Sequence, residues 1–410
     1  MRTRGGGGEP AVEFALLGAR PLFTEPRHVG RPNIGDRRVL MRRIDGILDR
    51  HWFTNNGPVV DEFEQAVASI AGVRHCVATC NGTVALEIAI QAAGLRGEVI
   101  TTPFTFVATA HALKWRGITP VFCDIDPLTH NIDPSEVERL ITPWTSGILG
   151  VHVWGRPCDV DALSEIADRR GLSLLFDAAH AFGSELGGRR IGSFGRAEVF
   201  SFHATKFVNA FEGGAIVTDD DELAEQARLF RNFGFSDYDQ VSTLGTNGKM
   251  SEVAAAMGLT SLESRDRFIA VNHRNFEAYD EALDGLPGIS LMPYDDDDAT
   301  ARQYVVIEVG DDAGLCRDEL QKVLWAENVL ARRYFYPGCH RLEPYRAEQE
   351  ASGRTLPQTD RVAARVLTLP TGTGITPEDA VTIAGLIRRA VRHGPALRRA
   401  LSARAAVACE

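Results

Sequence analysis

The sequence predicts an α/β fold with a large, mostly parallel sheet flanked by helices, followed by a smaller C-terminal α/β unit. Apolar runs of strand length alternate with helical periodicity between residues 75 and 220. The pattern becomes helical from about residue 250, and a second set of strand and helix patterns follows residue 300. Strands that alternate with helices are typical of βαβ units, whose sheets are mainly parallel. A length of 410 residues with 44% hydrophobic residues supplies ample material for a large core.

The elements of the large unit follow in order along the chain. Amphipathic periodicity predicts helices over residues 33–48 and 59–71, the second ending at Gly72. Seven apolar runs predict strands, at 75–79, 98–103, 120–125, 147–155, 172–179, 198–205 and 213–220. Helices are predicted between them at 83–95, 106–117 and 160–171. Ligands of such sheets bind at the carboxyl ends of the strands, so we expect a functional site there.

The C-terminal part has its own pattern. A helical stretch over residues 250–283 is broken at 284–288 and 293–298. A strand at 303–309 and helices at 318–329 and 377–391 follow. We therefore predict a flexible N-terminal tail over 1–20, which begins with a glycine run, a large domain over 21–280 and a small C-terminal domain over 281–410.

Composition and charge exclude several classes of protein. The formal net charge is −11 and no basic block occurs, which argues against nucleic acid or a membrane surface as the main partner. No apolar run approaches the roughly 20 residues that span a bilayer, and the N-terminus has no apolar signal segment. The seven cysteines form neither a Cys-x-x-Cys pair nor a zinc-like cluster. We expect a soluble cytoplasmic protein with reduced thiols and no metal site.

Two charged residues stand beside predicted strand ends. Asp177 follows the apolar run LSLLF, where an unpaired carboxylate is costly; its simpler interpretation is a helix N-cap. Lys206 follows the run EVFSFHAT, which includes Ser201 and His203. Most lysines are solvated, but a lysine in a pocket with a lowered pKa is what imine formation requires.

Two further features lie at strand-to-helix turns. The turn TCNGTVAL places Gly82 and Thr83 at a helix start, whose free N–H groups suit a phosphate, although Asn81 or Thr83 also fits a plain N-cap. The run PFTFVAT places Phe104 and Phe106 at a strand end, where aromatic residues usually belong to the core.

These four features together match the needs of pyridoxal 5′-phosphate (PLP). That cofactor requires a lysine for its Schiff base, an acid at its pyridine nitrogen, a phosphate-binding turn and commonly an aromatic ring against its face. One chain supplies all four at the expected edge of one sheet. The combination is far more specific than any of its parts.

The order of the motifs adds a resemblance. From about residue 30 to 390, the runs GPVVDEFEQAVA, NGTVALEIAI, TPFTFVATA, VHVWGRPCDVDAL, DAAHAFGSELGGRRIGSFG, FSFHATK, EGGAIVTDD and LGTNGKMSEVAAAMGL resemble the DegT/StrS-type sugar aminotransferases, which are fold-type I PLP enzymes. The resemblance implies that Lys206 forms the Schiff base and moves the proton, while Asp177 pairs with the pyridinium nitrogen. It implies a homodimer with shared sites. The further cofactor contacts that it implies are Gly82, Thr83, Phe106, His180 and Ser201 and, from the neighbouring subunit, Asn247.

The same resemblance suggests a reaction. The local form HATKFVNAFEGG and the run RRYFYPGCHRLEPY look most like enzymes that aminate dTDP-4-keto-6-deoxy-D-glucose at C4 for aminosugar biosynthesis. L-glutamate would be the donor, with pyridoxamine phosphate as the cofactor's second form. Candidate sugar-nucleotide contacts, each equally consistent with a solvated or core role, are Lys249, Arg333, Tyr336 and His340.

Three other functions stay open at this point. Amination at C3 of a 3-keto sugar nucleotide uses the same machinery. Amination of a keto-cyclitol would need no nucleotide contacts. A regulatory protein that kept the fold is a third reading, against which the presence of both Lys206 and Asp177 argues.

Overall fold

A computed structural model describes residues 14–294 and 299–407 of the chain. Its largest element is a seven-stranded sheet in the order β2-β10-β9-β6-β5-β3-β4. All neighbouring strands are parallel except β10, which runs antiparallel to both β2 and β9. The strands are β2 (His75–Thr79), β3 (Glu98–Thr101), β4 (Thr119–Phe122), β5 (Thr145–Val151), β6 (Ser173–Asp177), β9 (Ala197–Ser201) and β10 (Gly214–Thr218). The seven predicted strands and the mostly parallel sheet are thus confirmed.

Helices cover both faces of this sheet because successive side chains of each strand point to opposite sides. On β6, Leu175 packs in the core against one group of helices, while Leu174 and Phe176 pack against the other. The first face is covered by α3 (Gly82–Ala92), α4 (Ala108–Trp115) and α7 (Asp221–Arg231). The second is covered by α2 (Pro58–Ala71), α5 (Pro134–Leu140), α6 (Val160–Arg170) and α8 (Glu252–Glu263), and α1 (Arg37–Arg50) packs against α8. Every apolar strand is therefore buried on both sides, which explains its continuous hydrophobic run.

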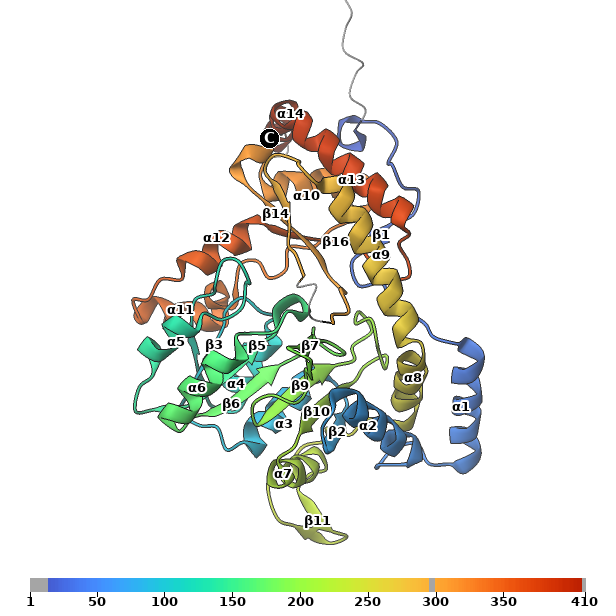
Figure 1. Ribbon diagram of the computed structural model, residues 1–410, viewed down its shortest axis with the longest axis vertical. Coiled ribbons are helices and arrows are strands. Elements are labelled where there is room, and N and C mark those ends of the chain that lie inside the picture. The colour runs from blue at the N-terminus through green and yellow to red at the C-terminus, as the bar shows by residue number, and fades with distance from the viewer. Residues whose placement is uncertain (1–13, 295–298, 408–410) are drawn as a thin grey trace, which may run out of the picture.

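A second, smaller sheet lies above the first in Figure 1. Its three antiparallel strands are β13 (Ile289–Leu291), β14 (Val305–Val309) and β16 (Val366–Leu369). Around it pack α9 (Arg265–Leu283), α10 (Arg317–Ala326) and α13 (Pro377–Arg392). We call residues 58–263 the large-sheet region and residues 289–392 the small-sheet region. Helix α9 runs between the two regions (Figure 1).

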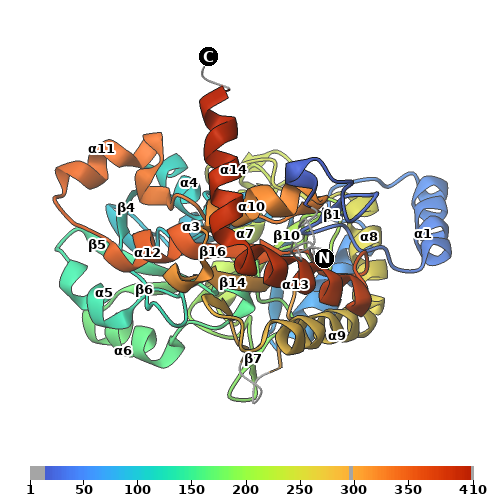
Figure 2. The same cartoon turned by 90° about the horizontal axis from the view of Figure 1, so that it is seen from above.

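The C-terminal part also reaches back over the first sheet. Helix α11 (Glu343–Ala351) lies beside α4, where Lys114 Nζ and Glu348 Oε1 form an ion pair. Helix α12 (Pro357–Arg365) is capped by Asp124, which accepts from the backbone N–H of Gln358 and Thr359. The last helix, α14 (Gly394–Val407), projects away from the body of the molecule in Figure 2. In the described part of the chain, no helix is both long and apolar enough to cross a membrane.

The start of the described chain joins the C-terminal half. Strand β1 (Arg27–His28) pairs in parallel with β15 (Val329–Leu330). Phe14 and Phe23 are buried in the same core cluster as the small sheet. Of the tail predicted over 1–20, residues 1–13 lie outside the described residues, and residues 14–20 contain the short 3₁₀-helix η1 (Ala15–Leu17). The core of the small-sheet region therefore uses residues from both ends of the sequence.

Short elements that the periodicity did not reveal lie between the main ones. They are the hairpins β7 (Glu185–Leu186) with β8 (Arg189–Arg190) and β11 (Phe235–Asp237) with β12 (Gln240–Val241), and the 3₁₀-turns η2 (Val153–Gly155), η3 (Asp311–Ala313) and η4 (Cys339–Arg341). Elements of two to four residues carry too few positions for a hydrophobic period to be seen.

Candidate active site

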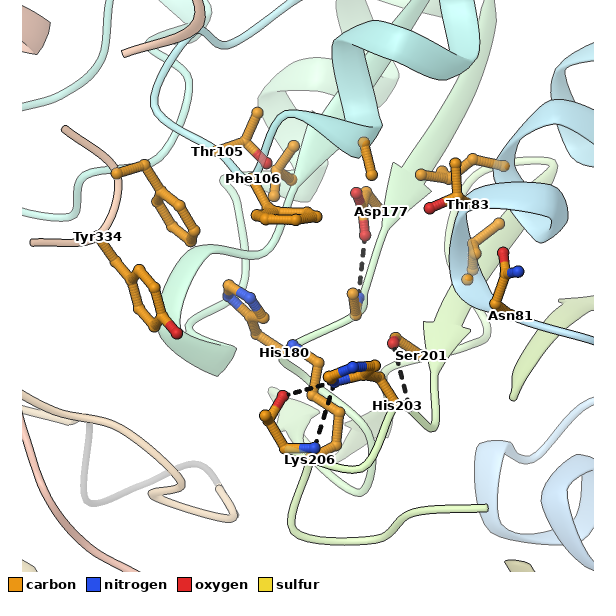
Figure 3. Close-up of a pocket in the computed structure, with 18 of the residues that line it drawn as sticks. Asn81, Thr83, Thr105, Phe106, Asp177, His180, Ser201, His203, Lys206 and Tyr334 are labelled. Atoms are coloured by element: carbon orange, nitrogen blue, oxygen red, sulfur yellow. Dashed lines mark hydrogen bonds between the residues drawn. The ribbon is translucent and has the colours of Figure 1, made fainter. Parts of the chain in front are cut away.

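A cavity of about 470 Å³ opens at the carboxyl ends of the large sheet's strands. Val151, Asp177 and Ser201, the last residues of β5, β6 and β9, all line it. Figure 3 shows the lining side chains around a common space, with Tyr334 on one side and Asn81 and Thr83 on the other. The cavity therefore lies at the edge of the sheet where the sequence predicts a site.

Asp177 lies at the buried end of β6, with 5% of its surface exposed. Thr109 Oγ1 donates to its Oδ2 at 2.7 Å, and the backbone N–H of Ala179 donates to its Oδ1 at 3.1 Å. Burial raises the pKa of Asp177, while these two hydrogen bonds and the nearby Lys206 oppose the rise. The carboxyl group is thus held rigidly in a place where a positively charged partner would favour its ionised form.

Thr109 belongs to a chain of hydroxyl groups behind this carboxylate. Its single hydrogen points to Asp177, so the 2.9 Å contact between Thr105 Oγ1 and Thr109 Oγ1 must have Thr105 as donor. Both threonines are buried. The chain therefore runs in one direction, from Thr105 through Thr109 to Asp177.

Lys206 lies in a turn beyond β9 rather than at the strand end predicted from the run 198–205. The strand stops at Ser201, and the backbone N–H of Lys206 closes a turn on the carbonyl of His203 at 2.8 Å. Its amine reaches into the cavity, and loss of hydration lowers the pKa of Lys206 to about 8, although the carboxylate of Asp177 opposes the shift. An amine with this pKa is about one-tenth neutral at pH 7 and about half neutral at pH 8, so a nucleophilic fraction is present near neutral pH.

His180 occupies the cavity wall between these two groups. The backbone N–H of Trp154 donates to its Nδ1 at 3.3 Å, which leaves the ring hydrogen on Nε2. Burial and the positive charge of Lys206 hold the pKa of His180 well below its usual range, so the ring is neutral. A neutral ring in this tautomer can donate one hydrogen bond to an oxygen atom.

The opposite end of the cavity is suited to an anion. Gly82 is the first residue of α3, where backbone N–H groups lack partners within the helix. A Cβ atom on Gly82 would lie only 3.1 Å from Cβ of Ser201, so the glycine allows these two segments to approach closely. Thr83 and Ser201 add hydroxyl groups to the same wall. Two hydroxyl groups and the positive end of a helix dipole favour a phosphate there.

Phe106 differs from Phe104, although both belong to the same run, PFTFVAT, after a predicted strand. Phe104 is fully buried in the core, whereas Phe106 is 60% exposed and lines the cavity. A large aromatic ring with this exposure in a cavity offers a flat surface to a planar group.

The predicted site residues fall into two sets. The cavity brings together seven of them: Gly82, Thr83, Phe106, Asp177, His180, Ser201 and Lys206. Five others lie outside its lining: Asn247, Lys249, Arg333, Tyr336 and His340. Asn247 is exposed and paired with Asn232 in an isolated bridge, and His340 Nε2 lies 3.0 Å from Asp360 Oδ1. The functional roles of all twelve stay predictions.

The C-terminal half contributes residues to the cavity that the sequence did not reveal. Tyr304, Tyr334 and Phe335 line the cavity from the small-sheet region. Phe335 stacks on the rings of Trp154 and His180, with centroids 5.3 and 5.7 Å apart. The run RRYFYPG is rich in aromatic residues, which is the signal that could have indicated them. The sequence-based prediction names Arg333 and Tyr336 in this run, whereas Tyr334 and Phe335 between them line the cavity.

Comparisons with known proteins agree with this geometry. The sequence pattern of the DegT/DnrJ/EryC1/StrS aminotransferase family matches residues 36–388. A dTDP-4-amino-4,6-dideoxy-D-glucose transaminase of Shigella dysenteriae is 40% identical over 346 residues, which cover 84% of this chain and 94% of the relative. A GDP-perosamine synthase of Caulobacter vibrioides is 34% identical, covering 83% and 94%.

A solved structure gives the same result for the fold. The crystal structure of DesI in the presence of its TDP-sugar product superposes with a TM-score of 0.90 at 52% identity, covering 94% of this chain and 98% of that one. The predicted fold class is therefore confirmed.

Proposed function

The chain belongs to the DegT/DnrJ/EryC1/StrS aminotransferase family, and on that premise we propose that it is a PLP-dependent transaminase of a nucleotide-linked keto sugar. The proposed acceptor is dTDP-4-keto-6-deoxy-D-glucose, the product its 4-amino-4,6-dideoxy sugar nucleotide, and the donor L-glutamate. The observation that carries the proposal is the amine of Lys206 in one cavity with the buried carboxyl group of Asp177.

The cavity offers a direct test of whether PLP fits. The cofactor needs a place for a dianionic phosphate, and Gly82 provides a helix N-terminus so close to Ser201 that a side chain at this position would fill it. It needs an acid away from that phosphate site, and Asp177 is held by two hydrogen bonds at another wall. It needs an amine that is neutral near pH 8, which describes Lys206. The residues therefore fit the group.

We assign the cofactor contacts accordingly. Gly82, Thr83 and Ser201 would bind the phosphate, and Phe106 would lie against the ring face. The Nε2 hydrogen of His180 would donate to the ring oxygen. Asn247 is assigned to the site of a neighbouring copy, which agrees with its position outside the cavity of its own chain.

The mechanism uses these residues in turn. PLP, when bound, supplies an aldehyde that condenses with amines and a ring that accepts electrons. The ionised carboxylate of Asp177 would hold a proton on the pyridine nitrogen, and the hydroxyl group of Thr109 keeps that carboxylate oriented. Lys206 Nζ, once released as a free amine, would take a proton from the donor's α-carbon and deliver it to the cofactor's aldehyde carbon in the first half reaction. In the second half reaction it would move a proton in the reverse sense, from that cofactor carbon to the sugar carbon that receives the nitrogen. The aromatic wall of Tyr334 and Phe335 would exclude water around that amine.

The sugar nucleotide follows from the relatives. The relative at 40% identity is named for the 4-amino-4,6-dideoxyglucose nucleotide, and the structural neighbour at 52% identity was crystallised with its TDP-sugar product. A relative at 34% identity is named for GDP-perosamine, which makes the nucleotide a part of the proposal to be tested separately.

Assembly and location complete the proposal. We propose a homodimer with shared sites and a cytoplasmic enzyme. Several exposed apolar side chains favour a partner surface, and they cluster in two stretches of sequence: Trp52 and Phe53, then Phe233, Phe235, Tyr238, Val241 and Leu244. Light scattering during gel filtration tests this part, with a monomer as the contrary result.

The first experiment combines purified protein, PLP and L-glutamate with dTDP-4-keto-6-deoxy-D-glucose, and identifies the product by mass spectrometry and NMR. A 4-amino-4,6-dideoxyhexose nucleotide supports both the reaction and its position. Parallel reactions contain the GDP-linked 4-keto sugar, a 3-keto sugar nucleotide and a keto-cyclitol. Turnover of one of these alone would replace the substrate and keep the transaminase.

A further inference from the structure

The small-sheet region places one hydroxyl group directly on the reactive amine. Tyr304 precedes β14, and its Oη lies 3.1 Å from Lys206 Nζ. Only 8% of Tyr304 is exposed. The two residues are far apart in the sequence and belong to different regions, so this contact forms only where the regions meet.

The hydroxyl group keeps its hydrogen over the whole working range of pH, because burial and the nearby Asp177 raise the pKa of Tyr304. A protonated phenol has one donor and two acceptor lone pairs. It can accept from Lys206 when the lysine is an ammonium ion, and it can donate to Lys206 when the lysine is a neutral amine. One group can therefore hold Nζ in both of its protonation states.

Tyr304 is itself held in place on both sides. Tyr294 Oη lies 2.9 Å from the carbonyl oxygen of Tyr304 and 3.0 Å from that of Trp154, so one hydroxyl group joins the two regions. The ring of Tyr304 packs against His180, with centroids 4.7 Å apart, and edge-on against Trp154 at 5.6 Å. A phenol fixed in this way cannot easily follow the lysine if it moves, and it defines where Nζ returns.

Other groups around Lys206 do not duplicate this contact. Asp177, from the large sheet, acts on the amine through its charge. Burial raises the pKa of Tyr334, from the small-sheet region, so its hydroxyl group is uncharged near pH 8. His180 is held neutral. The remaining titratable groups that line the cavity are His203 and Glu212, whose side chains form an ion-pair contact with each other at 3.5 Å. Within the described residues, Tyr304 supplies the hydrogen bond to Nζ.

We propose that Tyr304 is a positioning residue, which holds the free amine of Lys206 and sets its proton affinity from the small-sheet region. The proposal rests on the proposed function only in that Lys206 is the reactive amine. Charge-assisted hydrogen bonds are about twice as strong as neutral ones, so Tyr304 stabilises the ammonium form more than the amine form. Removal of the hydroxyl group should therefore lower the pKa of Lys206.

The test measures this pKa in the full-length chain freed of cofactor, so that neither PLP binding nor turnover is required. The chain has four lysines, Lys114, Lys206, Lys249 and Lys322, which peptide mass spectrometry can follow separately. Their acetylation by trace acetic anhydride is measured between pH 6 and 11, with the exposed Lys322 as internal reference. In the unchanged protein, labelling of Lys206 should rise with pH through about 8. In Tyr304→Phe, the midpoint should fall by about half to one pH unit.

Two further variants make the result specific. Tyr334→Phe removes a different hydroxyl group from the same cavity and should leave the midpoint of Lys206 in place. A ring-fluorinated tyrosine at position 304 keeps the shape and, because burial raises the pKa of this phenol, keeps its hydrogen near pH 8. Its hydroxyl group accepts more weakly from the ammonium form of Lys206 and donates more strongly to the amine form, so the midpoint should fall by less than in Tyr304→Phe. An unchanged midpoint in Tyr304→Phe, or an equal shift in Tyr334→Phe, overturns the proposal. If Tyr304→Phe does not fold, the fluorinated variant alone decides, since a purely structural role predicts no shift of the midpoint.

Discussion

The large-sheet region and the small-sheet region contribute to the site in different ways. In the large-sheet region, Asp177 and Ser201 end buried strands, so their positions follow from the regular geometry of a parallel sheet. In the small-sheet region, Tyr304 and Tyr334 precede or follow short elements and reach the cavity across the boundary. The first region therefore supplies groups whose placement is local to one sheet. The second supplies groups whose placement depends on how two cores meet.

This difference teaches which effects of mutation to expect. Groups from the large-sheet region carry the proposed chemistry, so their loss should abolish or strongly reduce turnover. Tyr304, from the small-sheet region, adjusts one amine, so its loss should change the proton affinity of that amine more than the maximal rate. The following predictions run from the largest expected effect to the smallest, and each one can break this division.

The largest effect is expected for Lys206→Ala. Removal of the nucleophile and general base should reduce transamination by about 10⁴-fold. The melting temperature should stay close to that of the unchanged protein, because the amine loses hydration in the fold and contributes little stability. Product formation is measured by mass spectrometry, and Lys322→Ala, at an exposed position, serves as control. Turnover comparable to that of the unchanged protein would remove Lys206 from the mechanism.

Asp177→Asn should reduce turnover by about 10²- to 10³-fold, because an amide cannot stabilise a positive charge in a buried site as a carboxylate does. The absorbance of bound PLP should persist, since the phosphate contacts and Lys206 remain. Single-turnover kinetics with glutamate measure the effect. A loss of less than about tenfold would mean that the carboxyl group of Asp177 has a structural role only.

Thr109→Val should reduce kcat by about tenfold. The variant keeps the shape but leaves Asp177 Oδ2 without its donor, and a hydrogen bond to a charged group contributes about 1.5 kcal/mol, near a factor of ten. Thr105→Val should cost only about twofold to threefold, since Thr105 acts through Thr109. Steady-state kinetics of the two variants test the direction of the chain: a larger effect at Thr105 would reverse it.

The smallest effect on turnover is expected for Tyr294→Phe, which removes the hydroxyl group that joins the two regions. The free energy of unfolding should fall by about 1 kcal/mol, and kcat should fall no more than about threefold. Tyr279→Phe is a matched control, because Tyr279 of α9 also donates from a buried hydroxyl group to a carbonyl, that of Pro370 in the small-sheet region. Only Tyr294→Phe should also shift the labelling midpoint of Lys206. An equal midpoint in both variants would show that the hydroxyl group of Tyr294 does not position Tyr304.

The sequence predicted the large-sheet region closely for a physical reason. Strands such as β6 are buried on both faces, so their apolar runs are continuous and a carboxylate at their end stands out. Local chemistry also revealed Gly82 at the start of α3. The apolar run predicts a strand over 198–205, but β9 ends at Ser201, and the backbone N–H of Lys206 turns back on the carbonyl of His203.

Tyr304 could not be found in this way. It precedes β14, a central strand with the ordinary pattern of a buried strand, and its ring would serve equally well in a core. Its role depends on the placement of Tyr294 and Trp154, which are far from each other in sequence. The prediction of Arg333 and Tyr336 as substrate contacts rests on their residue types. In the structure, Arg333 donates to Asp318 and lies over the ring of Tyr336. Residue type indicates chemistry, but only the packing of distant segments shows which copy of that type faces the cavity.

The pairing of β1 with β15 has a consequence for the order of events on the ribosome. All seven strands of the large sheet lie between residues 75 and 218, so this sheet can form while the rest of the chain is still being made. Phe14 and Phe23 precede this sheet in the sequence, but the core in which they are buried is complete only after β15 at Val329–Leu330 has been made. Through that interval the nascent chain carries these two aromatic residues without their core. During synthesis, the site for the amine is therefore built before the hydroxyl group that holds it.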